Sequence, residues 1–497
     1  MKRSSGILIP IFSLPSKYGI GTLGKEAYNF VDFLVDTKQT YWQMLPIMHT
    51  SFGNSPYSAV SSFAGNPFFI DFDLLKDDGL LDESDYKFLE IDKNPRRVDY
   101  EKQFEYKYKI LTKACDRFKK LHKDEYEKFE KSHSFYVDDY AMFLAIKEKF
   151  NGASFDKWPN EYKFRDGNAL NSFRNENVEL IDFYKTIQCL FFKQWFKLKK
   201  YANEKGIKII GDTPIYSAYD SAEVWAHPEN FLLDHEKKPI EISGCPPDGY
   251  APKGQLWGNP VYNFKYIEEK DFIYFIDKFD HLFKLYDILR IDHFRGFDSY
   301  YAIPYGNVDA TNGKWINAPG KKLFKRIKET LGDVNIIVED LGFLTDSVKE
   351  LLAETGFPGM KVLEFAFDSR DKSNTEYLPH TYPENSTAYL GTHDNDTFMG
   401  WIHSINEDDR NYAKEYLHLK DPANYYKEAL KVLYESKSNL AVVQFQDLLG
   451  TGSIGRMNTP STLSPMNWSY RLLPYELDDN AKNFLRELTV NTGRSNN

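Results

Sequence analysis

Eight short apolar runs recur along the chain, and polar residues follow each of them. Most of the runs do not alternate in polarity, which is typical of parallel strands buried on both faces. The segments between them are long enough for helices. The runs span 6–12, 41–48, 207–211, 286–291, 334–338, 360–367, 387–391 and 440–445. This pattern predicts an α/β fold, a (β/α)8 TIM barrel with helical and loop insertions that form subdomains, in a single domain over 1–497.

Two connecting helices can be predicted from spacing and stop signals. Apolar side chains before the third run recur at helical spacing, and Gly206 supplies the stop; they are Ile187, Leu190, Phe191, Trp195 and Leu198. Residues 320–331 form a second helical pattern, which Gly332 ends. Both helices precede a predicted strand, as barrel connections do.

Two further segments interrupt the regular alternation. Residues 75–180 are rich in Lys, Glu, Asp, Tyr and Phe with few Gly or Pro, which predicts a helical insertion subdomain between strands 2 and 3. Residues 244–260 (GCPPDGYAPKGQLWGNP) hold too many Pro and Gly for a helix or a strand. We interpret them as a structured loop over the barrel mouth, a candidate active-site lid.

Composition excludes several classes of protein. The 497 residues are 42% apolar, enough for a sizeable core, and Lys+Arg 63 against Asp+Glu 73 gives a net charge of -10. This acidic balance argues against a nucleic-acid partner. No apolar run is long enough to span a membrane, and the run at 7–12 is short and broken by Pro10, which predicts a cytoplasmic protein.

Neither the cysteines nor any common cofactor-binding motif indicates a disulfide, a metal site or a phosphate site. Cys115, Cys189 and Cys245 are widely spaced and form neither a disulfide framework nor a C-x-x-C motif. The sequence contains no H-E-x-x-H and no Gly-rich phosphate loop, so a metalloprotease and a P-loop enzyme are unsupported. We therefore expect neither a cofactor nor a catalytic metal.

Acidic residues follow five of the predicted strands: Asp212, Asp292, Glu339, Asp394 and Asp447. In a barrel these positions open onto the face where active sites are built. A single acid there often caps a helix, but five together suggest glycoside chemistry. In that chemistry one carboxylate attacks the anomeric carbon and another protonates the leaving oxygen.

Basic and aromatic residues near these acids fit sugar binding. Arg290, two residues before Asp292 on the same strand face, could pair with that carboxylate and keep it ionised. His293 and His393 could hydrogen-bond sugar hydroxyls, or could be internally satisfied histidines. Four aromatic residues in loop-like segments could stack on sugar faces: Tyr57, Trp225, Tyr250 and Trp257.

Ordered motifs from Ser4 to about Trp468 resemble the 4-alpha-glucanotransferases, also called amylomaltases or disproportionating enzymes, of glycoside hydrolase family 77. They are SPYS (55–58), FAGNP (63–67), GDTPIY (211–216), DSAEVWAHPENF (220–231), GQLWGNPVY (254–262), RIDHFRGF (290–297), VEDLG (338–342), GFPGMKVLEFAFD (356–368), GTHDNDT (391–397), QDLLG (446–450) and RMNTP (456–460). The sequence departs from the family pattern in the middle of 244–260 and at 460–462 and 466–468, where we expect local loop changes.

The resemblance implies a role for each candidate site residue. Asp292 matches the family's nucleophile, Glu339 its general acid/base and Asp394 its transition-state-stabilising carboxylate. The matches to its sugar ligands and loop contacts are Asp212, Arg290, His293, His393, Tyr57, Gln255 and Trp257. It also implies a barrel fold and the absence of a cofactor or catalytic metal.

The implied reaction is the transfer of part of an α-1,4-glucan to the 4-hydroxyl of glucose or a maltooligosaccharide, with retention. It requires Glu339 to be less ionised than Asp292. An α-amylase-like hydrolase would use the same residues with water, and only the products separate the two. A non-catalytic glucan-binding protein is disfavoured because all three acids are present. An aldolase-type barrel would need a Schiff-base lysine, and no lysine immediately follows a predicted strand.

Overall fold

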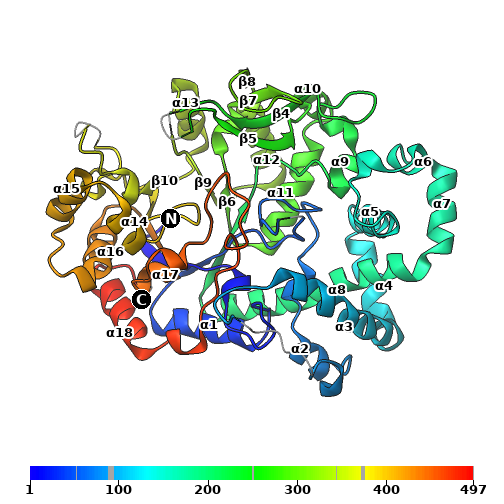
Figure 1. Ribbon diagram of the computed structural model, residues 1–497, viewed down its shortest axis with the longest axis horizontal. Helices are drawn as coiled ribbons and strands as arrows, with labels where there is room; N and C mark the ends of the chain where they lie inside the picture. Colours follow the sequence, from blue (N-terminus) through cyan, green and yellow to red (C-terminus); the bar gives the residue numbers. More distant parts are fainter. Residues whose placement is uncertain (52, 88–93, 249–250, 343, 371–374, 496–497) are drawn as a thin grey trace.

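The computed structural model describes residues 1–51, 53–87, 94–248, 251–342, 344–370 and 375–495. Eight parallel strands form its central sheet in the order β10-β11-β12-β1-β2-β3-β6-β9 (Figure 1). They are β1 (Ser4–Leu8), β2 (Tyr41–Gln43), β3 (Lys208–Thr213), β6 (Ile288–Ile291), β9 (Ile336–Val338), β10 (Gly359–Val362), β11 (Ser386–Tyr389) and β12 (Leu440–Gln444). Each overlaps one predicted run, so the barrel prediction is confirmed.

The barrel closes between β9 and β10, the two ends of that strand order. No strand ladder joins them among the described residues. The backbone N–H of Val338 donates to the carbonyl of Pro358 at 3.0 Å, and the carboxylate of Asp340 accepts from the backbone N–H of Met360 at 2.6 Å. Because proline has no N–H, a regular ladder cannot continue through position 358.

Helices surround the barrel, and both predicted helices are confirmed. The helix before the third strand is α8 (Val178–Glu204), and the segment ended by Gly332 is α12 (Gly320–Leu331). The other outer helices are α1 (Lys25–Asp36), α10 (Phe264–Glu269), α11 (Ile273–Leu285), α13 (Asp346–Thr355), α14 (Phe398–Ser404), α15 (Glu407–Leu417), α16 (Tyr425–Glu435) and α18 (Asp479–Asn491).

The long connection from β2 to β3 is helical. It holds α2 (Phe72–Asp77), α3 (Tyr100–Leu121), α4 (Lys123–Ser132), α5 (Val137–Lys149), α6 (Asn160–Lys163) and α7 (Gly167–Glu176) before α8. Figure 1 shows most of these helices to one side of the barrel, and α3, α4 and α5 pack on α8. Whether this insertion is a separate subdomain stays a prediction.

A second, antiparallel sheet lies beside the barrel (Figure 1), and the sequence did not predict it. Its order is β5-β4-β7-β8, with β4 (Glu241–Cys245), β5 (Gln255–Pro260), β7 (Ser299–Pro304) and β8 (Lys314–Asn317). The interpretation of 244–260 as neither helix nor strand is therefore wrong at both ends. Gly244 permits the pairing, because a Cβ there would lie 2.1 Å from the backbone oxygen of Gln255.

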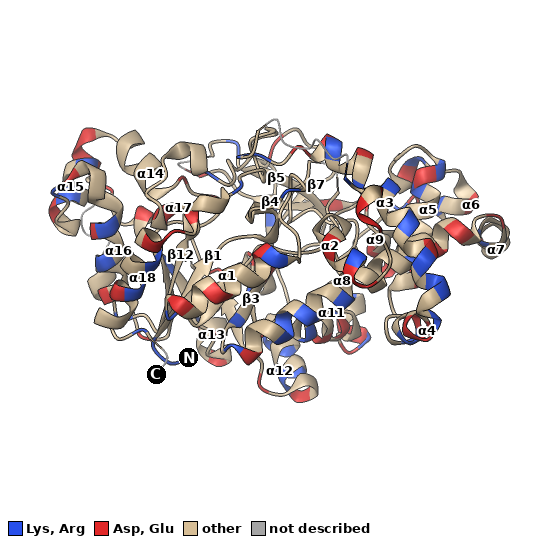
Figure 2. Ribbon diagram, turned by 90° about the horizontal axis from the view of Figure 1, so that it is seen from below, with Lys and Arg blue, Asp and Glu red and all other residues tan. Residues whose placement is uncertain are grey.

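Charges of both signs mix on the outer helices. Figure 2 shows Lys and Arg interleaved with Asp and Glu on α4, α12 and α15. Within the described ranges, no helix combines the length and the apolar character that crossing a bilayer demands.

Candidate active site

Four acidic side chains lie at the carboxyl ends of barrel strands. Asp212 lies within β3, Asp292 directly follows β6, and Glu339 directly follows β9. Asp394 lies in the loop after β11. Because the strands are parallel, these positions share one end of the barrel.

Arg290 on β6 links three of these carboxylates. Its side chain is 3% exposed, and its Nη1 donates to both oxygens of Asp212 at 2.8 and 2.7 Å. The same nitrogen contacts Asp292 Oδ1 at 3.2 Å, and Nη2 donates to Glu339 Oε2 at 2.9 Å. One buried cation therefore offsets the mutual repulsion of three acids and fixes their spacing.

Asp292 and Glu339 lie on the same guanidinium, and the pKa of each depends on the charge of the other. Burial, followed by the charge of Glu339, raises the pKa of Asp292 well above its ordinary value. Burial also acts to raise the pKa of Glu339, but Arg290, Asp292 and the backbone N–H of His293 together lower it. The two carboxyls titrate as one coupled pair, so the expectation that Glu339 is the less ionised partner stays a prediction.

His293 joins the acid pair to the aromatic wall of the site. Its backbone is left-handed, with φ 50 and ψ 53, and its N–H donates to Glu339 Oε2 at 3.1 Å. Its ring meets Trp257 edge-on, with centroids 4.7 Å apart. Burial lowers the pKa of His293 to about 4, so the imidazole is neutral at pH 7. Its Nε2 is buried without a partner among the described residues and can therefore bond a sugar hydroxyl.

Tyr57 and His393 form a second wall. The Tyr57 hydroxyl donates to Asp212 Oδ2 at 2.8 Å and lies 3.4 Å from His393 Nδ1. The two rings stack with centroids 5.0 Å apart and planes 18° apart, and Trp468 packs against both. The stack fixes the position of the Tyr57 hydroxyl beside Asp212.

Asp394 is held by residues that the sequence argument left without a role. Asn458 Nδ2 donates to Asp394 Oδ1 at 2.6 Å, and Arg456 Nη2 donates to the Asp394 carbonyl at 2.9 Å. His393 Nε2 lies 3.6 Å from Asp394 Oδ2. Both new residues belong to the RMNTP motif, which was the available signal.

The β4–β5 hairpin supplies the other predicted contacts. Trp257 Nε1 donates to Gln255 Oε1 at 3.1 Å, so these two residues act together. Tyr250 lies outside the described residues. Trp225 is wrong as a stacking residue, since it is fully buried in α9 (Ala222–Ala226) among Phe143 and Trp158.

Asp447, the fifth predicted acid, has a different role. It is buried and its Oδ1 accepts from the backbone N–H of Phe398 at 2.7 Å, at the start of α14. Burial raises its pKa to about 7. Among the described residues, no group of three or more His, Cys, Asp or Glu side chains is placed to hold a metal ion.

Comparison with known proteins identifies close relatives. The family model described as 4-alpha-glucanotransferase matches residues 9–476. The 4-alpha-glucanotransferase of Clostridium butyricum is 45% identical over 486 residues, covering 97% of this chain and 99% of that protein. The 4-alpha-glucanotransferase of Thermus thermophilus is 39% identical over 507 residues, covering 99% of each chain.

Solved structures agree with the sequence comparison. The amylomaltase of Streptococcus agalactiae in complex with acarbose superposes with a TM-score of 0.97, at 43% identity and full coverage of both chains. The amylomaltase of Corynebacterium glutamicum, at 18% identity and a TM-score of 0.78, covers 98% of this chain and 75% of that one. The second match supports the fold alone.

Proposed function

Because the chain belongs to the 4-alpha-glucanotransferase family, we propose that Asp292, Glu339 and Asp394 carry out its transfer reaction. The reaction itself moves a segment of an α-1,4-glucan to the 4-hydroxyl of glucose or of another glucan. The observation that carries the residue assignment is that Asp292 and Glu339 both contact the buried guanidinium of Arg290.

The two carboxyl groups perform a double displacement. Asp292 attacks the anomeric carbon while Glu339 protonates the departing oxygen, which leaves a glycosyl ester on Asp292. The acceptor 4-hydroxyl then attacks that carbon, Glu339 takes its proton, and the ester bond breaks. Both carboxyls contact the single Arg290 guanidinium, which supports this retaining route, since retaining carboxyls lie about 5–5.5 Å apart and an inverting pair leaves a gap of about 6.5–9.5 Å for water.

The first step needs a proton on Glu339 and an ionised Asp292. We propose that the coupled pair holds one proton, which lies on Glu339 when the glycosidic oxygen approaches it. Asp292 is then ionised, as a nucleophile must be, with Arg290 at 3.2 Å to stabilise it.

The remaining site residues bind the sugar in this proposal. The residues that face the sugar in the cleavage subsite are Tyr57, Asp212, Arg290, His293 and His393. Asp394, held by Asn458, binds ring hydroxyls more tightly in the oxocarbenium-like state than in the ground state.

Gln255 and Trp257, on the hairpin that includes the predicted lid 244–260, contact the incoming glucan. The lid excludes water, so that a bound hydroxyl competes with solvent through its effective molarity. The cytoplasmic location and the absence of a nucleic-acid partner stay predictions.

Incubation with maltotriose tests the function, with products separated by chromatography. We expect glucose together with a ladder of longer maltooligosaccharides, whereas glucose and maltose alone would indicate hydrolysis. The Asp292→Asn variant tests the nucleophile, because the amide is nearly isosteric but attacks poorly. Turnover should fall by several orders of magnitude while maltodextrin still binds. Loss of binding with turnover per bound substrate intact would assign Asp292 to positioning instead.

A further inference from the structure

A short hairpin holds Tyr57 at the active site. The first arm of this hairpin begins at His49. Val60 N–H donates to the His49 carbonyl at 2.8 Å, and Ser51 N–H donates to the Ser58 carbonyl at 2.7 Å. Tyr57 directly precedes the second arm, which runs from Ser58 to Val60. A shift of the first arm therefore moves the Tyr57 ring relative to its catalytic neighbours.

The His49 imidazole sits between two tyrosine hydroxyls from different helices of the insertion. Its Nδ1 lies 2.8 Å from the hydroxyl of Tyr140 on α5, and its Nε2 lies 3.1 Å from the hydroxyl of Tyr108 on α3. The residue is 4% exposed, and burial lowers its pKa to about 3. A neutral imidazole offers one donor and one acceptor, so its tautomer decides which hydroxyl donates to it and which accepts from it.

Gln188 on α8 sets that tautomer. Its Oε1 accepts from the backbone N–H of Gly65 at 2.7 Å and its Nε2 donates to the Gly65 carbonyl at 2.9 Å, which fixes the amide orientation. The same Nε2 donates to the Tyr140 hydroxyl at 3.0 Å. Tyr140 is therefore left to donate to His49 Nδ1, and His49 Nε2–H donates to Tyr108. The hydrogen bonds therefore run in one direction, and their donors in order are Gln188, Tyr140 and His49, with Tyr108 on α3 as the last acceptor.

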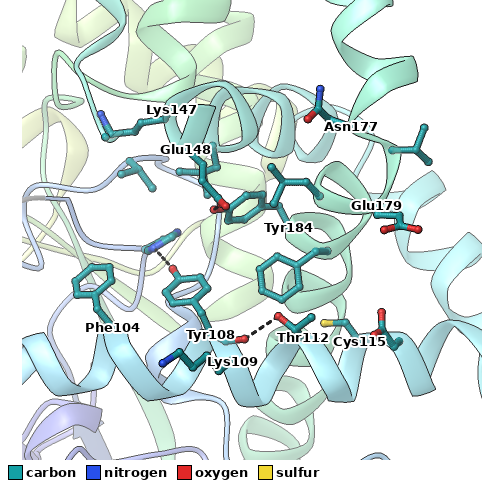
Figure 3. A pocket seen from close by; sticks show the side chains of 18 of the residues that line it. Phe104, Tyr108, Lys109, Thr112, Cys115, Lys147, Glu148, Asn177, Glu179 and Tyr184 are labelled. Carbon is teal, nitrogen blue, oxygen red and sulfur yellow. Dashed lines mark hydrogen bonds between the residues drawn. The ribbon is translucent and has the colours of Figure 1, made fainter. Parts of the chain in front are cut away.

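A large cavity lies on the insertion side of the hairpin. Its volume is about 1540 Å³, and its lining includes His49, Thr50, Ser51 and Val60. Figure 3 shows Tyr108 on its wall, with a hydrogen bond at its hydroxyl. His49, Thr50 and Val60 are buried where this cavity meets the hairpin, and the directional bonds of His49 tie the first arm to α3 and α5 across it.

We propose that His49 is a positioning residue for glucan transfer, which holds the hairpin so that Tyr57 stays against Asp212 and His393. The residue touches none of the reacting atoms and acts through Tyr57. The inference rests on the sugar-binding role proposed for Tyr57, and the test below separates the two.

A double-mutant cycle with maltotriose as substrate tests the inference. His49→Phe keeps a ring but removes both hydrogen bonds, and we expect it to raise KM about fivefold or more with a much smaller change in kcat. Tyr57→Phe should also raise KM. Adding His49→Phe to Tyr57→Phe should then change KM less than about twofold, because both changes remove one restraint. Multiplicative effects on KM would overturn the inference.

Tyr184→Phe is the matched control. It removes a tyrosine hydroxyl that donates to Glu148 at 2.8 Å in the same cavity but does not contact the hairpin. It should lower the melting temperature without moving KM. An equal rise of KM in this variant would show that any loss of packing in the insertion has the same effect.

A second variant keeps the inference testable if His49→Phe does not fold. Tyr140→Phe removes only the hydroxyl that donates to Nδ1 and should raise KM in the same direction, with circular dichroism confirming the fold. If Tyr57→Phe leaves KM unchanged, the proposed role of Tyr57 fails. If Tyr57→Phe raises KM but the folded His49→Phe and Tyr140→Phe variants do not, the positioning inference alone fails.

Discussion

At the scale of single residues, Arg290 holds three acidic side chains of the site together. It contacts Asp212, Asp292 and Glu339 together, so the placement of all three carboxylates depends on one guanidinium. Position along the chain predicted acids at the strand ends, and three of the five contact Arg290, whereas Asp447 bonds the start of α14. The distances from Arg290 to each carboxylate come from packing, which no sequence pattern encodes.

Glu339→Gln separates the acid from the nucleophile. With a maltosyl fluoride the leaving group needs little protonation, so Asp292 still attacks and the glycosyl ester then persists for lack of a base. Mass spectrometry of the peptide that contains Asp292 should show the adduct. Asp292→Asn is the control and should give none. An adduct on another residue, or consumption of the fluoride without one, would contradict the assigned roles.

Residue-level prediction was weakest for side chains whose partners are distant in sequence. Asn458 lies 64 positions from Asp394, and Tyr140 lies 91 positions from His49. A single Asn or His in a loop has no periodicity to reveal such a partner. The acids could be predicted because each follows an apolar run, which places it at a strand end whatever the rest of the fold does.

At the scale of elements, apolar runs predicted the barrel strands but not the second sheet. Most barrel strands are buried along their length, and only β3 and β10 have exposed or half-buried positions, so each strand lies in or beside an apolar run. β8 is mostly exposed and β5 alternates between exposed and half-buried positions. Their Gly, Pro, Asn and Lys content therefore resembles that of a loop.

The β4–β5 hairpin gives a prediction about water exclusion. Trp257→Ala should raise the ratio of hydrolysis to transfer more than it lowers total bond cleavage, because the incoming glucan loses a stacking surface. Product chromatography measures both rates. Leu256→Ala is the control, since Leu256 is 38% exposed on the same strand. A parallel fall of both rates in Trp257→Ala would assign Trp257 to packing against His293.

Lys107 on α3 gives a prediction about stability. Its side chain is 1% exposed, its Nζ is buried without a hydrogen-bond partner in the described ranges, and burial lowers its pKa to about 7. The unfolded chain therefore binds this proton more readily, so stability should rise as pH increases from about 7 to 10.

Lys107→Met should raise the free energy of unfolding at pH 7 by on the order of 2 kcal/mol and abolish that rise with pH. Urea unfolding at several pH values measures both effects. Lys109→Met, at an exposed position of the same helix, should change neither. Lower stability of Lys107→Met at pH 7 would show that the ammonium contact with the Phe72 ring, at 4.5 Å, outweighs burial.

At the scale of the whole molecule, two arginines tie β1 to the last helices. Arg494 donates to the carbonyls of Tyr434, Ser4 and Ser436 at 2.8–3.1 Å. Arg3 donates to those of Thr492, Ser436 and Tyr434 at 2.7–3.0 Å. These bonds link the ends of α16 and α18 to the start of β1.

Arg494→Ala should lower the free energy of unfolding by about 3 kcal/mol, because it removes three hydrogen bonds from a buried charged donor. The shift of the urea midpoint measures this loss. Arg486→Ala removes an exposed bond from α18 to the Asp36 carbonyl and should cost less than about 0.5 kcal/mol. Equal losses in the two variants would contradict a special role for the buried arginine.

The seam between β9 and β10 gives the two proposed catalytic carboxyls different backbone support. Asp292 follows β6, which is bonded to a strand on each side, whereas Glu339 follows β9, which is laddered on one side only. Backbone with fewer bonds opens locally at lower cost, so we expect Glu339 to have the greater amplitude of motion. The nucleophile must return to one carbon in both half-reactions, while the acid/base has to serve first a leaving oxygen and then an arriving one. The missing ladder between β9 and β10 therefore favours movement of Glu339, the member of the pair that has to adjust.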